Sequence, residues 1–176
     1  MDIQTLKPSA EPARDGAREA SDPAGTCASL RHRVTVGGWV HWPLVLDLAT
    51  LVRRDAVEVP DFELVCTADG SHGVLPPMRG VLLRDLIQEA RPAFERRTDF
   101  KRAAVMVESC DGYRALFSWG ELFHTMVGDG VLLVFDHPAA PLGTGVGPFA
   151  LISRYDRYTG PRFMRGLQRV ELHKLW

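Results

Sequence analysis

The stretch FELVCTADGSHGVLPPMRGVLL, residues 62–83, combines the patterns that decide the fold class: an alternating run, a glycine- and proline-rich segment, and the start of an apolar repeat. In the alternating run, Phe62, Leu64 and Cys66 would share one face of a strand, because successive side chains point to opposite faces. Cys66 therefore ends a predicted strand. Its spacing favours a buried structural thiol, although strand ends also present functional groups.

Beyond this stretch the sequence predicts a helix within residues 80–91. Five apolar residues recur there at helical spacing and leave a charged opposite face: Leu82, Leu83, Leu86, Ile87 and Ala90. Upstream, residues 33–40 alternate and then bend at Gly37 and Gly38, and a short helix capped by Asp47 follows Pro43. We expect residues 57–66 to form one strand.

Downstream, residues 102–109 and 113–117 read as two strands joined by a tight turn at Asp111 and Gly112. Ser118 and Glu121 form a capping box for a helix that we expect to run to about Val127. Three more segments read as strands, the last of them an edge or returning strand: 131–136, 148–155 and 165–175. Several strands with few helices, in no regular alternation, indicate an α+β fold.

Length and composition limit the classes of protein. With 176 residues, the chain favours one domain, expected over residues 31–176 after a polar, disordered tail over 1–30. The net charge of -1 argues against a nucleic-acid or acidic-membrane partner. The sequence has neither an apolar run of roughly 20 residues nor a signal-peptide core, so we expect no membrane span and a cytoplasmic location. Cys27, Cys66 and Cys110 form no CxxC pair, which argues against a disulfide framework.

The isolated motifs are weak. The glycine-rich residues 143–147 (GTGVG) lack the Lys-Ser/Thr of a phosphate-binding P-loop, so a flexible loop is the better interpretation. The histidines are scattered without metal-binding spacing, and no GxSxG nucleophile elbow occurs. None of these motifs assigns a function by itself.

Seven segments taken in order are more specific, and they span residues 33–172: VTVGGWVHWPLVLDLATL, ELVC, MRGVLLRDLI, AAVMVESCDGY, VLLVFDHPAAPL, GVGPFALI and FMRGLQRVEL. This series resembles the molybdopterin-binding oxidoreductase domain of sulfite oxidases, plant nitrate reductases and bacterial methionine-sulfoxide reductase catalytic subunits. The resemblance implies an α+β fold with several β layers and a β-grasp-like part. It also implies a molybdenum-pyranopterin cofactor, a small-molecule substrate and an external electron donor or acceptor protein.

The resemblance assigns site residues one by one. Cys66 matches the cysteine whose thiolate binds molybdenum, a pairing that suits a soft metal in a sulfur-rich site. Three segments match positions near the cofactor: Ser109 with the Asp111, Gly112 and Tyr113 run, Gly147 with Pro148, and Arg165, whose cation suits the cofactor phosphate.

The chain also departs from the family pattern. Ala150 stands where the family usually has an arginine, and Arg154, four residues further, lies roughly 13 Å away along a strand. The matching segments end at residue 172, and we expect no counterpart here of the preceding segment of the larger enzymes or of the C-terminal dimerisation domain of sulfite oxidases. Two hypotheses follow: a minimal molybdenum oxidoreductase that transfers an oxygen atom or electron pairs, or a cofactor-free domain of the same fold that acts as a binding or interaction module.

Overall fold

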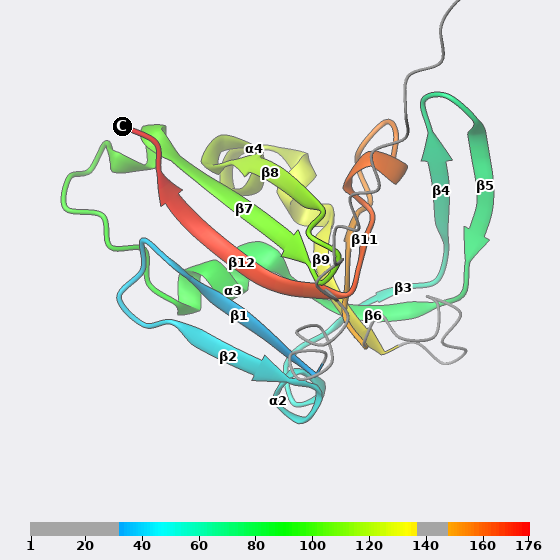
Figure 1. Cartoon of the computed structure of the whole chain (residues 1–176), viewed down its shortest axis with the longest axis horizontal. Helices are drawn as coiled ribbons and strands as arrows, with labels where there is room; N and C mark the ends of the chain where they lie inside the picture. Colours follow the sequence, from blue (N-terminus) through cyan, green and yellow to red (C-terminus); the bar gives the residue numbers. More distant parts are fainter. Residues whose placement is uncertain (1–31, 137–147) are drawn as a thin grey trace, which may run out of the picture.

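The computed structural model describes residues 32–136 and 148–176, which form two five-stranded sheets, a separate two-stranded hairpin and a few short helices (Figure 1). The tail expected over residues 1–30 lies outside these residues, as does Gly147. The predicted α+β class is confirmed.

The first sheet has the strand order β2-β1-β12-β7-β8. Its strands are β1 (Arg33–Gly38), β2 (Leu44–Asp47), β7 (Ala103–Ser109), β8 (Arg114–Ser118) and β12 (Leu167–Lys174). The last strand, expected to be an edge or returning strand, lies in the centre, parallel to β1 and antiparallel to β7. Alternation along β12 indicates which face is buried, but it carries no information on whether the strand's two edges are paired.

The second sheet has the order β11-β10-β9-β6-β3. Its strands are β3 (Val57–Val59), β6 (Met78–Leu82), β9 (Val131–Asp136), β10 (Ala150–Ser153) and β11 (Met164–Arg165). Along β9, Leu133 packs into the larger core, whereas Leu132 and Val134 pack into a smaller core on the other side. This burial on both faces explains why β9 is an unbroken apolar run.

The prediction of a single strand over residues 57–66 is wrong, because the structure has two strands there, separated at Pro60. Proline has no backbone N–H to continue a ladder. β3 therefore pairs with β6, whereas β4 (Phe62–Cys66) forms the hairpin with β5 (Gly70–Leu75). The glycine-rich segment that followed Cys66 in the sequence is thus mostly a strand.

The helices are shorter than their sequence patterns. α2 (Leu48–Val52) is capped by Asp47 as expected, and α3 (Leu83–Glu89) begins after Leu82, which belongs to β6. α4 (Trp119–His124) has the predicted capping box but stops at Thr125, where a 3₁₀ turn, η2 (Met126–Gly130), begins. Two further 3₁₀ turns are η1 (Asp99–Arg102) and η3 (Gly160–Arg162).

Two apolar cores hold these layers together. The larger is shared by both sheets with α3 and α4, and the smaller lies between the second sheet and the β4–β5 hairpin and includes Phe62 and Met78. The hairpin therefore packs on the second sheet and carries Cys66 at the end of β4. Within the described residues, no helix is both long and apolar enough to cross a membrane.

Candidate functional site

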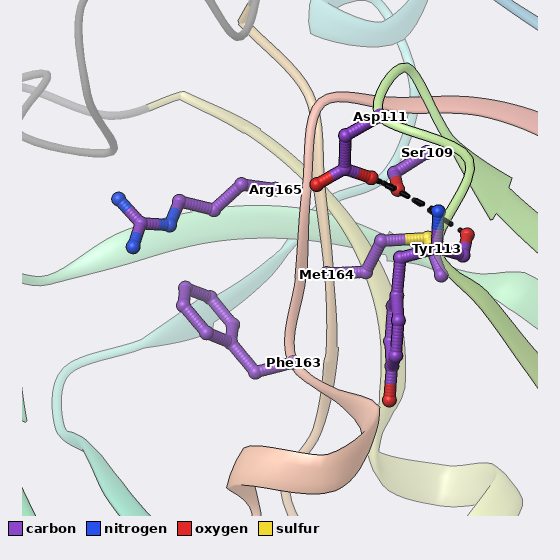
Figure 2. A pocket seen from close by; sticks show the side chains of 6 residues that line it. All are labelled: Ser109, Asp111, Tyr113, Phe163, Met164 and Arg165. Atoms are coloured by element: carbon purple, nitrogen blue, oxygen red, sulfur yellow. Dashed lines mark hydrogen bonds between the residues drawn. The ribbon is translucent and has the colours of Figure 1, made fainter. Parts of the chain in front are cut away.

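A pocket of about 260 Å³ lies where the turn between β7 and β8 meets the segment from η3 to β11 (Figure 2). Six described residues line it: Ser109, Asp111, Tyr113, Phe163, Met164 and Arg165. Four of them were assigned from the sequence, on two segments more than 50 positions apart. The fold brings these two segments together.

The β7–β8 turn is built by its own polar side chains. The Asp111 carboxylate accepts hydrogen bonds from the Ser109 hydroxyl and from the backbone N–H of Tyr113, the second at 3.0 Å. Gly112 has φ +84°, a conformation that residues with a side chain rarely adopt. The predicted turn is therefore confirmed.

These contacts also fix the charge of Asp111. The Ser109 hydroxyl, followed by the Tyr113 N–H, lowers the pKa of the Asp111 carboxyl by stabilising its ionised form. Asp111 thus places a negative charge at the pocket wall. This charge opposes an anionic group at the same point, so an anion would have to lie on the side of Arg165.

Tyr113 connects the turn to the opposite wall. Tyr113 lines the pocket and is 47% exposed, and its hydroxyl donates a 2.5 Å hydrogen bond to the carbonyl of Pro161 in η3. In Figure 2 the hydroxyl points toward the η3 turn, away from Ser109. The ring is therefore the part of Tyr113 that a ligand would meet.

The other wall comes from residues 163–165. Met164 is buried, and the Phe163 ring lies 6.1 Å from the ring of Phe62, which connects this wall to the hairpin. Arg165 is exposed and extends away from Asp111 in Figure 2. Arg165 is the one cationic side chain among the six described lining residues.

Cys66 occupies a different position. It lies at the end of β4, half-buried, and is not among the described residues that line the pocket. Its Sγ packs against Gly160 of η3, where an added Cβ would overlap the sulfur. The structure therefore brings Ser109, Asp111, Tyr113 and Arg165 into one pocket and places Cys66 against the adjoining η3 turn.

Two residues beside Cys66 were not singled out from the sequence. Thr159 is 7% exposed; its hydroxyl accepts a hydrogen bond from the N–H of Val65 at 2.8 Å and donates one to the carbonyl of Glu63 at 2.6 Å. Gly160 follows it against the sulfur. The Gly160-Pro161 dipeptide marked a turn, but no local pattern indicated which distant strand it would contact.

Ala150 stands where the family pattern has an arginine, and Arg154 was the nearby candidate to replace it. Ala150 is buried in the smaller core, and the guanidinium of Arg154 lies 5.7 Å from the ring centre of Tyr155. Neither belongs to the described lining of the pocket. Arg154 therefore does not take over the arginine position of the family pattern in this pocket.

The donor groups present fit a molybdenum-pyranopterin cofactor at two points. The half-buried Cys66 thiol offers one soft sulfur ligand, and Arg165 offers a cation for a phosphate. Gly160 has no side chain, and a Cβ at this position would overlap the sulfur. The hydroxyls of Ser109 and Tyr113 are already engaged by the protein.

The comparisons agree with this description at the level of fold. No family model matches the sequence, and no match appears among curated proteins. Among solved structures, however, a dehydrogenase has a similar fold. That structure is the sulfane dehydrogenase SoxCD from Paracoccus pantotrophus, with a TM-score of 0.60 and 17% sequence identity.

The match covers 82% of this chain but only 39% of the SoxCD chain. It confirms the fold expected from the sequence resemblance. At this identity the similarity is one of fold, and the remaining part of the SoxCD chain has no counterpart in the match.

Proposed function

We propose that this protein is a molybdopterin-dependent oxidoreductase domain that binds a molybdenum-pyranopterin cofactor through Cys66 and acts on a small substrate. One observation carries the proposal: Ser109, Asp111, Tyr113 and Arg165, assigned from the family resemblance, line one pocket in a fold similar to that of a sulfane dehydrogenase.

In this proposal each residue has a defined task. The Cys66 thiolate would bind molybdenum, and the Arg165 guanidinium would pair with the cofactor phosphate. Asp111 would keep the turn rigid, so that the exposed ring of Tyr113 presents a fixed surface to the ligand. The bound cofactor would supply oxygen-atom or two-electron transfer, with an external protein as electron donor or acceptor.

A second candidate function is a cofactor-free domain of the same fold that binds another small ligand in the pocket. The observation in its favour is that Cys66 lies outside the described pocket lining, packed against Gly160. In this case Cys66 is a packing residue, and Arg165 still selects an anionic ligand.

Metal analysis separates the two candidates. The full chain should be produced in a host that makes the cofactor, and its molybdenum content and released pterin fluorescence measured. We expect near-stoichiometric molybdenum in the wild type, its loss in Cys66→Ser, and wild-type content in the matched control Cys27→Ser, which lies in the expected tail.

The outcomes are distinct. Wild-type protein without molybdenum or pterin would support the cofactor-free alternative. A Cys66→Ser variant that retains full molybdenum would remove Cys66 as the ligand while leaving cofactor binding in place. In Arg165→Gln we expect weaker retention of the cofactor during dialysis, because one charge-assisted contact to the phosphate is lost.

A further inference from the structure

We infer that Thr159 and Gly160 are positioning residues for Cys66: the Thr159 hydroxyl holds the open edge of β4, and the missing side chain of Gly160 sets the place of the sulfur. The functional meaning of this inference rests on the proposed role of Cys66. The structural part of the inference is only that these two residues orient the Cys66 thiol.

Thr159 lies at the open edge of β4. The β4–β5 hairpin is a two-stranded sheet, so one edge of β4 has no neighbouring strand in the described part of the chain. Thr159 meets this edge with one side chain, accepting from Val65 N–H at 2.8 Å and donating to the Glu63 carbonyl at 2.6 Å. The hydroxyl thus makes the two hydrogen bonds that a neighbouring strand would otherwise make.

The hydrogen bonds of Thr159 stabilise the hairpin. A two-stranded hairpin on its own is marginally stable in water, so β4 and β5 depend on contacts with the rest of the protein. Thr159 is 7% exposed, so a backbone group left there without its partner could not easily turn to water. The contact lies directly before Cys66, and the hydroxyl therefore limits how far that end of β4 can move.

The sulfur of Cys66 lies directly against Gly160. A Cβ at Gly160 would overlap Cys66 Sγ and lie 3.1 Å from the carbonyl oxygen of Val65. The carbonyl is backbone and cannot swing aside, so a larger residue would displace the thiol or the strand. Gly160 therefore fixes the distance between η3 and the end of β4.

The contacts of Arg162 hold η3 in place. Arg162 donates to both carboxylate oxygens of Asp156, at 2.6 and 2.5 Å, and to Glu121 in α4 at 3.1 Å. Its guanidinium also lies 4.4 Å from the ring centre of Phe117, a fully buried residue of β8. Thr159 and Gly160 are thus attached to a turn that is anchored in the body of the protein.

The test is the rate at which iodoacetamide alkylates Cys66 in the folded full chain, measured peptide by peptide by mass spectrometry. We expect Thr159→Val to raise the rate about tenfold, because the unpaired edge opens locally, and Thr159→Ser, which keeps the hydroxyl, to retain the wild-type rate. We expect Gly160→Ala to raise it as well, by pushing the sulfur off η3. Gly37→Ala is the matched control, since no atom lies within 4 Å of its added Cβ.

The alkylation rate of Cys110, measured in the same digests, shows whether a variant loosens the whole fold. A rise at Cys66 with an unchanged Cys110 rate supports positioning, and an equal rise at both overturns it. A Cys66 rate within about twofold of wild type in Thr159→Val also overturns it. These rates do not depend on molybdenum: wild-type protein without the metal would refute the proposed function and leave the positioning inference to be decided by the rates.

Discussion

The second sheet and the hairpin that packs on it are held by different forces. The sheet has apolar side chains on both faces of β9 and β10, and β9 is paired on both edges, with β10 and with β6. The hairpin buries one face through Phe62, Leu64 and Leu75, whereas most of β5 is exposed. Its far end, with Cys66, is held by polar contacts to the η3 turn.

This difference separates stability from function in the molecule. Apolar burial is non-directional and tolerates small shifts, so it can maintain the sheet without fixing one atom. Hydrogen bonds have defined geometry and can fix the place of a single sulfur. We therefore expect changes in the sheet to alter the free energy of unfolding, and changes around the hairpin end to alter mainly local properties.

The largest effect is expected from the centre of the sheet. Leu133 of β9 is fully buried in the larger core, and Leu133→Ala should lower the free energy of unfolding by about 2–5 kcal/mol through lost contacts and a cavity. Val74→Ala in β5, 64% exposed, should change it by less than about 0.5 kcal/mol. Urea unfolding measures both, and comparable losses would refute the contrast between sheet and hairpin.

A smaller loss is expected from Gly80→Ala in β6. The added Cβ would lie 2.7 Å from the Leu133 carbonyl oxygen and 3.2 Å from the Leu132 Cβ, so β6 and β9 would have to separate. We expect a loss of about 1–3 kcal/mol in the same unfolding experiment. Gly37→Ala on β1 meets no atom within 4 Å, and equal destabilisation by both would show that strand spacing is not the cause.

Tyr113→Phe tests the connection between the pocket and η3. The variant removes the hydrogen bond to the Pro161 carbonyl but keeps the ring, so we expect a loss of about 0.5–1.5 kcal/mol. Hydrogen exchange should quicken at Phe163, whose N–H bonds to the Gly160 carbonyl, and remain unchanged in β9. Faster exchange in β9 would mean that the two regions are not independent.

The sequence predicted the features that depend on local patterns. Ser118 and Glu121 form the expected capping box, Asp47 caps α2, and the Asp111-Gly112 turn joins two strands. Each depends on residues within a few positions of one another. The family resemblance assigned Ser109 and Arg165 to one cofactor site, which local patterns cannot do, and both line one pocket in the structure.

The features that were missed depend on contacts between distant segments. Alternation in 57–66 suggested one strand, but Pro60 ends the pairing with β6 and the chain turns to a new partner. Nothing near Thr159 in the sequence shows that its hydroxyl would meet Val65, 94 positions away. Nor does the composition of β12 show that it is the central strand.

Acid offers a further way to separate the regions, through the buried carboxylate of Asp99. Asp99, 1% exposed, accepts hydrogen bonds from the N–H groups of Glu95 and Arg96 and from Arg102. The Arg96 N–H and then the Arg102 guanidinium lower the pKa of Asp99 to about 2. Because the folded pKa lies below the unfolded value, this carboxylate stabilises the fold above about pH 4 and loses that contribution as pH falls toward 2.

Asp99→Asn should remove this part of the pH dependence. Urea midpoints measured from pH 7 to pH 2 should converge for wild type and variant at the acid end, with the wild type more stable above pH 4. Thr159 carries no ionisable group, so the protection of the Val65 N–H against hydrogen exchange, which depends on its bond to the Thr159 hydroxyl, should stay constant while the 95–102 turn loosens. A parallel loss of protection at Val65 would show that the hairpin end depends on the first sheet rather than on η3.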